Sequence, residues 1–207
     1  VSPLWDNYEI MVLNWIEDTW DVAKKGRKAR YAHLGWDNTM GTCGIKPGQM
    51  YVKRLKNVEW VSTEIAPPRT MDFSTYMVRM KQANLDYIWL PLVGAPFASA
   101  LKTALELGMS PKQFVAAGST VGQWESVIDA VGADKLNGVL HAIDQKAYSD
   151  KAAGIELMVD LWKKNYPKES LPAAASVWSW SIGPMFAIPE AIKIAVKDVG
   201  IDKVDSA

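Results

Sequence analysis

The residues best suited to chemistry in this chain are few and far apart. Cys43 is the one cysteine, and His33 and His141 are the two histidines, among the 207 residues. A thiol beside an imidazole can act as a nucleophile. Both histidines, however, fall inside predicted strands, where core or surface positions with satisfied hydrogen bonds explain them better than a catalytic base. One cysteine and two histidines are also too few for a zinc site built from these residues. We predict no catalytic residue and no metal site.

Motifs of enzymes and nucleotide sites are also missing from the sequence. The glycines at 35, 41 and 44 do not form G-x-G-x-x-G, and no G-K-[ST] follows them. A tight strand-to-helix turn explains them better. Asp37 could serve catalysis or cap a helix, and capping is the favoured interpretation. A nucleophile elbow of the G-x-S-x-G type is absent. We therefore expect a protein that is not an enzyme and uses no cofactor.

Composition narrows the class further. Lys+Arg and Asp+Glu number 23 each, and 49% of the residues are hydrophobic. A neutral chain without a basic block argues against nucleic acid as a partner. The chain begins VSPLWDNYEI, which has no features of a signal peptide, so we expect that a signal has been removed or that the chain starts within a longer protein. No stretch reaches the roughly 18 apolar residues of a membrane-spanning helix.

Apolar periodicity predicts an alternation of strands and helices. Residues 8–25 have helical spacing and end in a basic turn and Gly26. Strands are predicted at 29–34, 58–65, 87–92, 113–117 and 138–143, and helices between them at 46–56, 73–83, 97–105 and 124–131. Such an alternation indicates an α/β fold with a parallel, Rossmann-like sheet flanked by helices on both faces.

The alternation stops after Tyr148. Two helical segments, 152–166 and 177–199, follow without a strand between them. They cannot bury their apolar surface on the same sheet as easily as the earlier helices, so we assign them to a second structural unit. The predicted organisation is 1–26, a helix leading into a lobe; 27–148, a ligand-binding lobe; and 149–207, a helical segment that belongs elsewhere.

A ligand of such a sheet would bind beyond the carboxyl ends of the strands. One loop there, AAGSTVGQW, contains small residues that let a ligand approach the backbone. Ser119 and Thr120 precede a helix whose free N–H groups favour an anion. Simple helix capping by one of the two hydroxyls explains this loop at least as well.

The order of these segments resembles the type I periplasmic solute-binding proteins of ABC importers, and among them the branched-chain amino acid (leucine-type) receptors. The resemblance is carried by ARYAHLGWDNTMG, ALKTALELGM, FVAAGSTVG, LNGVLHA and above all EIAPPRTMDFSTYMVRMKQANLDYIWLPLVG. In that last segment a strand ends in prolines, TMDFS opens a helix and a second strand follows. Leu85 stands where the family usually has proline. The similarity extends over residues 27–199.

The resemblance implies two α/β lobes that trap a solute between them. Residues 27–143 would match the second, C-terminal lobe, and residues 150–199 would match helices that return to the first. The first part of the N-terminal lobe would then be missing from this chain. The returning helices would lack their sheet, so their apolar faces would pack on the second lobe, on another copy of the chain or on a missing piece. A homodimer through these exposed faces, or an exchanged element, is therefore among the expectations.

The resemblance also implies where the second lobe touches solute. Met40 stands where the family commonly has an aromatic residue, and Leu92, Val93 and Gly94 follow the third strand. Ser119, beside Thr120, stands where a carboxylate often pairs with the ligand's ammonium group. These departures favour apolar or neutral contacts, so an apolar or aromatic acid or another small organic solute fits as well as an amino acid.

These inferences predict a periplasmic or extracellular solute-binding component of an ABC importer, whose partners are a small solute and the permease subunits. A ligand-sensing domain of a receptor is the alternative. An α/β enzyme or a receiver-like signalling domain is a weaker one, because the fold does not decide function.

Overall fold

The computed structural model describes residues 5–118, 123–143, 153–171 and 188–201. The chain divides into two compact units, Val1–Asp144 and Gln145–Ala207.

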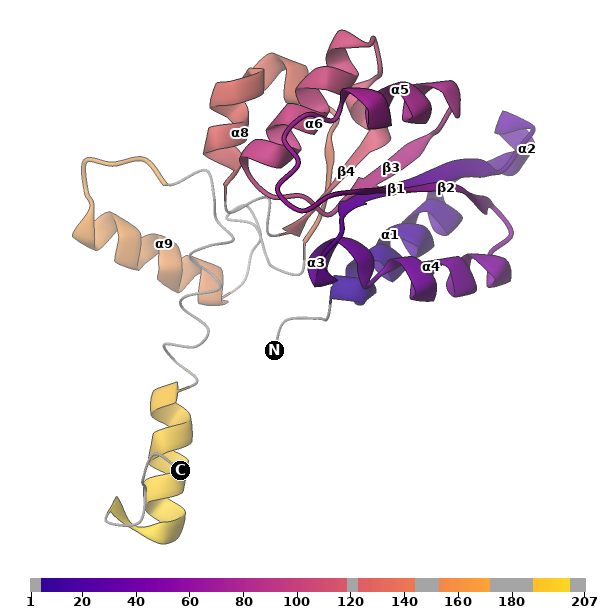
Figure 1. Cartoon of the computed structure of the whole chain (residues 1–207). Helices are drawn as coiled ribbons and strands as arrows, with labels where there is room; N and C mark the ends of the chain where they lie inside the picture. The colour runs from indigo at the N-terminus through magenta and orange to yellow at the C-terminus, as the bar shows by residue number, and fades with distance from the viewer. Residues whose placement is uncertain (1–4, 119–122, 144–152, 172–187, 202–207) are drawn as a thin grey trace. The chain divides into compact units, whose positions relative to one another are not determined.

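The first unit is built on a parallel sheet, as the sequence predicts. Its strands have the order β2-β1-β3-β4-β5, and every neighbouring pair is parallel (Figure 1). The sheet therefore needs a crossover between successive strands, and the intervening helices provide it. The strands are β1 (Ala29–Trp36), β2 (Val58–Ala66), β3 (Tyr87–Leu90), β4 (Phe114–Ala117) and β5 (Leu140–Ala142).

Helices cover both faces of this sheet (Figure 1). One face carries α1 (Trp5–Thr19), α3 (Thr39–Thr42) and α4 (Ile45–Tyr51). The opposite face carries α5 (Ser74–Gln82), α6 (Ala95–Glu106) and α8 (Trp124–Val131). The predicted α/β class, with helices on both faces, is confirmed.

Two apolar cores result, one on each face. Side chains of a strand alternate between faces, so Ala32 and Leu34 of β1 join the core under α5, α6 and α8. Ala29 and Tyr31 of the same strand join the core under α1. Sheets covered on both faces need apolar residues in both registers. This requirement explains the nearly continuous apolar runs of β3 and β4.

The first predicted helix differs from the expectation of one helix over residues 8–25. It divides into α1 and a short helix α2 (Val22–Lys25), because the Asp21 side chain accepts a hydrogen bond from the Lys24 N–H and caps a new start. Gly26, with φ 70°, ends α2. The α1 helix belongs to the compact unit itself, and the Glu17 carboxylate accepts the backbone N–H groups of Lys56 and Asn57 just before β2.

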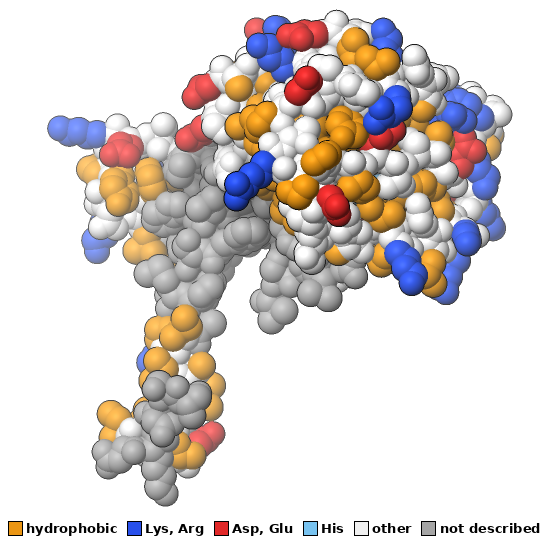
Figure 2. Space-filling model, in the orientation of Figure 1, with side chains coloured by type: hydrophobic (Ala, Val, Ile, Leu, Met, Phe, Trp, Pro, Cys, Tyr) orange, Lys and Arg blue, Asp and Glu red, His pale blue; other side chains and the backbone are white. Residues whose placement is uncertain are grey.

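The charged surface of the first unit is mixed. Figure 2 shows Lys and Arg beside Asp and Glu on the displayed face, with apolar side chains between them. Salt bridges join Arg27 to Asp86, Arg30 to Glu59 and Arg79 to Glu64. Exposed pairs of this kind add little stability.

The second unit contains helical segments, in agreement with the prediction. α9 (Ala153–Asn165) buries Ile155 and Met158, and its Trp162 ring stacks on Tyr166 with the centroids 4.5 Å apart. A further helix spans 188–199 and leaves Ile188, Ile192 and Ile194 at least half exposed. The predicted helix start at 177 lies outside the described residues. Within the described ranges, every helix is too short or too polar to cross a membrane.

Packing of α1 on the sheet predicts a strong stability effect. Leu13 is fully buried under the sheet, whereas Met11, two residues earlier on the same helix, is 40% exposed. We expect Leu13→Ala to lower the free energy of unfolding by about 3 kcal/mol, because it leaves a cavity in the core. Met11→Ala, the matched control, should cost about 1 kcal/mol or less. Urea unfolding measures both. Equal, small losses would show that α1 is not part of the folded unit.

Candidate functional site

The carboxyl ends of the strands meet at one edge of the sheet, which we call the rim. Strand register brings the ends together: Trp36 lies opposite Ala66, and Ala117 lies opposite Ala142. The loops that follow β1, β2, β3 and β4 all begin at this edge. In open α/β sheets this is where ligands bind, so the rim is the candidate site.

The loop after β1, residues 37–44, lies tightly against the end of its own strand. Asn38 caps α3, and its Oδ1 accepts the Gly41 N–H at 2.8 Å. The expectation that Asp37 caps this helix is wrong: Asn38 has the extended backbone that an N-cap requires. A Cβ at Gly41 would lie 2.1 Å from the Trp36 carbonyl oxygen, so this close approach needs glycine. Met40, the predicted solute contact, is half-buried here.

The loops after β1 and β2 hold each other at the rim. The indole N–H of Trp36 donates to the Thr70 carbonyl at 3.3 Å, and the Asp37 N–H donates to the Ala66 carbonyl at 2.8 Å. The Ser99 hydroxyl of α6 donates to the Met71 carbonyl at 2.6 Å. This second loop therefore links the start of the rim to the helix that follows β3.

The loop after β3 carries three of the predicted site residues. Leu92 is fully buried in the core under α5, α6 and α8, so its side chain does not face the rim. Val93 is half-buried. Gly94 has φ 56°, and a Cβ there would lie 1.8 Å from Oε1 of Gln123, at the start of α8. Contact between Gly94 and Gln123 brings the loops after β3 and β4 together. Ser119 and Thr120 lie outside the described residues, and their predicted role stays a prediction.

Directly beneath the first loop lies a buried polar cluster that the sequence analysis missed. Glu9 of α1 and His33 of β1 are 0% and 1% exposed. His33 Nδ1 lies 2.8 Å from Glu9 Oε1, and His33 Nε2 lies 2.7 Å from the Gly41 carbonyl oxygen. The Tyr31 hydroxyl donates to the same Glu9 oxygen at 2.7 Å. Both ring nitrogens of His33 are therefore engaged by oxygen atoms, which leaves no ring nitrogen to activate Cys43 as a base.

A signal for this cluster is present in the sequence. Glu9 lies three, four and seven residues before Val12, Leu13 and Ile16, on the apolar face of the first helix. A charged residue in that register is buried when the face is buried. Buried charged groups are paired, so a polar partner on a neighbouring strand could be expected.

His141 of β5 has a different environment. Its ring meets the edge of Trp124 with the centroids 4.2 Å apart, and its Nδ1 is buried without a hydrogen-bond partner. Burial lowers the pKa of His141 to about 4. His141 is thus neutral at physiological pH and belongs to the packing between β5 and α8.

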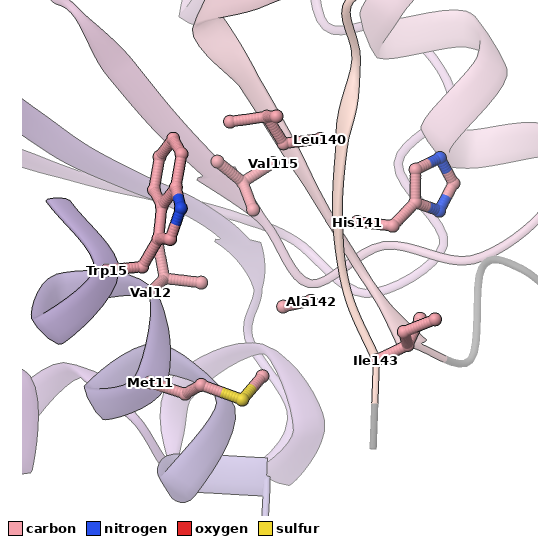
Figure 3. Close-up of a pocket in the computed structure, with 8 residues that line it drawn as sticks. All are labelled: Met11, Val12, Trp15, Val115, Leu140, His141, Ala142 and Ile143. Carbon is pink, nitrogen blue, oxygen red and sulfur yellow. The ribbon is translucent and has the colours of Figure 1, made fainter. Parts of the chain in front are cut away.

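An apolar cavity of about 290 Å³ lies between α1 and the edge strand β5 (Figure 3). Figure 3 shows the His141 ring pointing away from Trp15, on the opposite side of the strand. Among the predicted solute contacts that the structure describes, Met40, Leu92, Val93 and Gly94 do not line this cavity. It is bordered by Met11, Val12, Trp15, Val115, Leu140, His141, Ala142 and Ile143. In the part of the chain that the structure describes, no three His, Cys, Asp or Glu side chains gather as metal ligands.

Comparison with known proteins identifies the class to which this fold and rim belong. A family model for periplasmic binding proteins matches residues 14–204. The chain belongs to the periplasmic binding protein family, whose members bind rather than transform their ligands. A search of curated proteins found no match.

Solved structures show the same fold. A branched-chain amino acid ABC transporter protein from Thermus thermophilus with bound valine matches with TM-score 0.70 and 20% identity, over 96% of this chain and 49% of that chain. A fatty acid ABC transporter substrate-binding protein from Thermomonospora curvata matches with TM-score 0.65 and 18% identity, over 84% and 43%. This chain thus spans less than half the length of either structure.

The contact between Gly94 and Gln123 yields a test of the rim. In Gly94→Ala, the new Cβ would overlap the Gln123 amide and occupy a backbone conformation at φ 56° that L residues rarely adopt. We expect a loss of about 2 kcal/mol or more in the free energy of unfolding. Gly154→Ala is the control, because nothing lies within 4 Å of its new Cβ. Similar stabilities for both variants would contradict the packed rim.

Burial of His141 predicts a pH dependence. Because the pKa in the folded protein is about 4 rather than 6.5, the unfolded chain binds a proton first as the pH falls. The contribution to stability is complete above pH 6.5 and disappears as the pH falls towards 4. We expect the free energy of unfolding to fall by about 2 kcal/mol between pH 7 and pH 5 from this group. His141→Phe should remove that part of the slope in urea titrations; an unchanged slope would refute it.

Proposed function

We propose that the first unit is one lobe of a two-lobed solute-binding protein that delivers a small organic solute to an ABC importer. The observation that carries this proposal is the parallel sheet of order β2-β1-β3-β4-β5, whose connecting loops gather at the rim. A second lobe closing over this rim would enclose a solute and give the transporter a closed shape to recognise. The family of the chain supports this function.

Two half-buried apolar side chains at the rim, Met40 and Val93, favour an apolar contact with the solute, and the loop after β3 contains no charged residue. Charged partners for a solute's ammonium or carboxylate would then come from the other lobe or from the exposed Asp37, Arg69 and Asp72 in the loops after β1 and β2. Of the two similar structures, one holds bound valine and the other is a fatty acid transporter's substrate-binding protein. We therefore propose a solute with a substantial apolar part, such as an aliphatic or aromatic acid or an apolar amino acid.

The second unit would form part of the other lobe. Its α9 and the helix 188–199 carry apolar stripes without a sheet of their own among the described residues. Exposed Ile188, Ile192 and Ile194 support a contact with further protein, either the remainder of that lobe or a second copy of the chain. The homodimer stays a prediction. The proposed protein partner is the permease of an ABC importer. The proposed location of this protein is the periplasm or the outside of the cell.

Solute binding can be tested by thermal unfolding of the full-length gene product. The Tm is measured with each member of a panel of aliphatic acids, aromatic acids and amino acids. A binding solute stabilises the folded state by RT ln(1 + [L]/Kd), where [L] is its free concentration, and so raises the Tm. We expect an apolar acid or apolar amino acid to raise the Tm. A panel that leaves the Tm unchanged would contradict the proposal.

Met40 provides the sharper test. Met40→Ala removes a half-buried apolar contact at the rim and should weaken solute binding about tenfold in calorimetric titration. Met50→Ala is the control, because Met50 lies on α4 and is 60% exposed. It should leave the Kd unchanged. Equal affinities of both variants would show that the loop after β1 does not contact solute.

A further inference from the structure

We propose that Glu9 and His33 form a buried positioning pair that holds the loop after β1, and with it Met40, in the geometry that meets solute. The functional part of this inference rests on the proposed function, because Met40 contacts solute only if the rim is the solute site. The structural part stands on the contacts of the pair alone.

The direction of the hydrogen bonds follows from the atoms involved. The Gly41 carbonyl oxygen can only accept, so His33 Nε2 carries a hydrogen and donates across 2.7 Å. On the other side of the ring, Nδ1 lies 2.8 Å from Glu9 Oε1. His33 thus connects helix α1 to the backbone of the loop through one rigid ring.

On the other side of the ring lies the carboxyl group of Glu9. Glu9 Oε1 accepts the Tyr31 hydroxyl at 2.7 Å and lies 2.8 Å from His33 Nδ1. Burial, and then the charge of Glu9 and the hydrogen bond to it, raise the pKa of Tyr31 well above its usual value, so the phenol remains a donor. One buried oxygen of Glu9 thus joins the phenol and the imidazole.

The loop and the end of its strand approach this pair closely at two glycines. A Cβ at Gly35 would lie 2.3 Å from the Gly41 oxygen and 2.8 Å from His33 Nε2. A Cβ at Gly44 would lie 2.2 Å from Glu9 Oε2. The loop therefore touches the pair at two places, one next to Met40 and one at its end. The Trp60 ring lies nearly parallel to His33, 17° from its plane, and confines the imidazole from the side.

Stability alone does not account for a polar pair in this buried place. Buried polar or charged pairs contribute little net stability compared with apolar residues of the same volume, because both groups lose their hydration. What Glu9 and His33 provide that apolar residues cannot is a directed hydrogen bond to Gly41. We therefore assign the pair to positioning of the loop.

Two substitutions of His33 separate its two contacts. In His33→Gln the amide nitrogen reaches the place of Nε2 and can still donate to Gly41. In His33→Asn it reaches only the place of Nδ1 and leaves the Gly41 carbonyl without its donor. Tyr31→Phe is the control, because it removes one contact of Glu9 but leaves the link between His33 and Gly41 intact.

Amide hydrogen exchange is the readout. The N–H groups of Gly41 and Cys43 are bonded within the loop, to Asn38 and Thr39. We expect His33→Asn to speed exchange of these two amides about tenfold or more, relative to a reference amide such as Leu107 at the end of α6. His33→Gln and Tyr31→Phe should leave the ratio within about threefold of the parent. A merely structural role would shift all amides together, and equal effects in both His33 variants would overturn the proposal.

A measurement on the unmodified protein covers the case in which a variant does not fold. The ¹⁵N chemical shifts of His33 report which ring nitrogens carry hydrogen. We expect a hydrogen on Nε2, because the Gly41 carbonyl oxygen 2.7 Å away can only accept. An unprotonated Nε2 would exclude the bond to Gly41 and overturn the proposal.

Solute affinity tests the functional part of the proposal. Where a solute has been found, His33→Asn should weaken its binding as Met40→Ala does, and His33→Gln should restore most of it. Normal affinity in His33→Asn despite fast loop exchange would remove the functional part of the inference. If no solute binds at all, the proposed function fails, whereas exchange and ¹⁵N shifts still decide whether the pair positions the loop.

Discussion

Parallel strands hydrogen-bond in a sheet that must be covered on both faces, and this constraint organises the whole first unit. Each strand has to be followed by a helix that returns the chain to the same end of the sheet. The carboxyl ends of all strands, and the loops that follow them, consequently meet at one edge. The rim is thus a consequence of strand pairing, and its character depends on which side chains the loops place there.

The two faces of the sheet differ in what they bury. Under α5, α6 and α8 the fully buried side chains of the core are apolar, and Leu92 is one of them, while the partly buried His141 packs on Trp124 at the edge of this core. Under α1 the core contains Glu9 and His33, which are the fully buried charged or polar side chains of the described residues. Because these groups must be paired, their hydrogen bonds hold the side chains in fixed orientations, which the contacts of an apolar core do not. The hydrogen bond from His33 to Gly41 extends this constraint to the backbone of the loop that carries Met40.

Much of the fold could be predicted because its signals are local. Glycines and prolines at the ends of elements, and apolar runs such as 87–92, indicate strands and helices from neighbouring residues alone. Local signals failed where two neighbouring residues could play the same role. Asp37 and Asn38 both suit the N-cap of α3, and Asn38 is the residue whose backbone takes the required extended conformation. Likewise Asp21 divides the first helix by bonding to Lys24, which periodicity alone does not indicate.

The sequence by itself determined the parallel α/β class, the family of the chain and the loops that form the rim, because each depends on the order and period of residues along the chain. Tertiary structure decided which residues of those loops face the rim. It buried Leu92, left Val93 half-buried, placed Gly94 against Gln123, and joined Glu9 to His33 across 24 positions of sequence. The physical reason is that burial and hydrogen-bond partners depend on distances between segments, and these are set only when helices pack on the sheet.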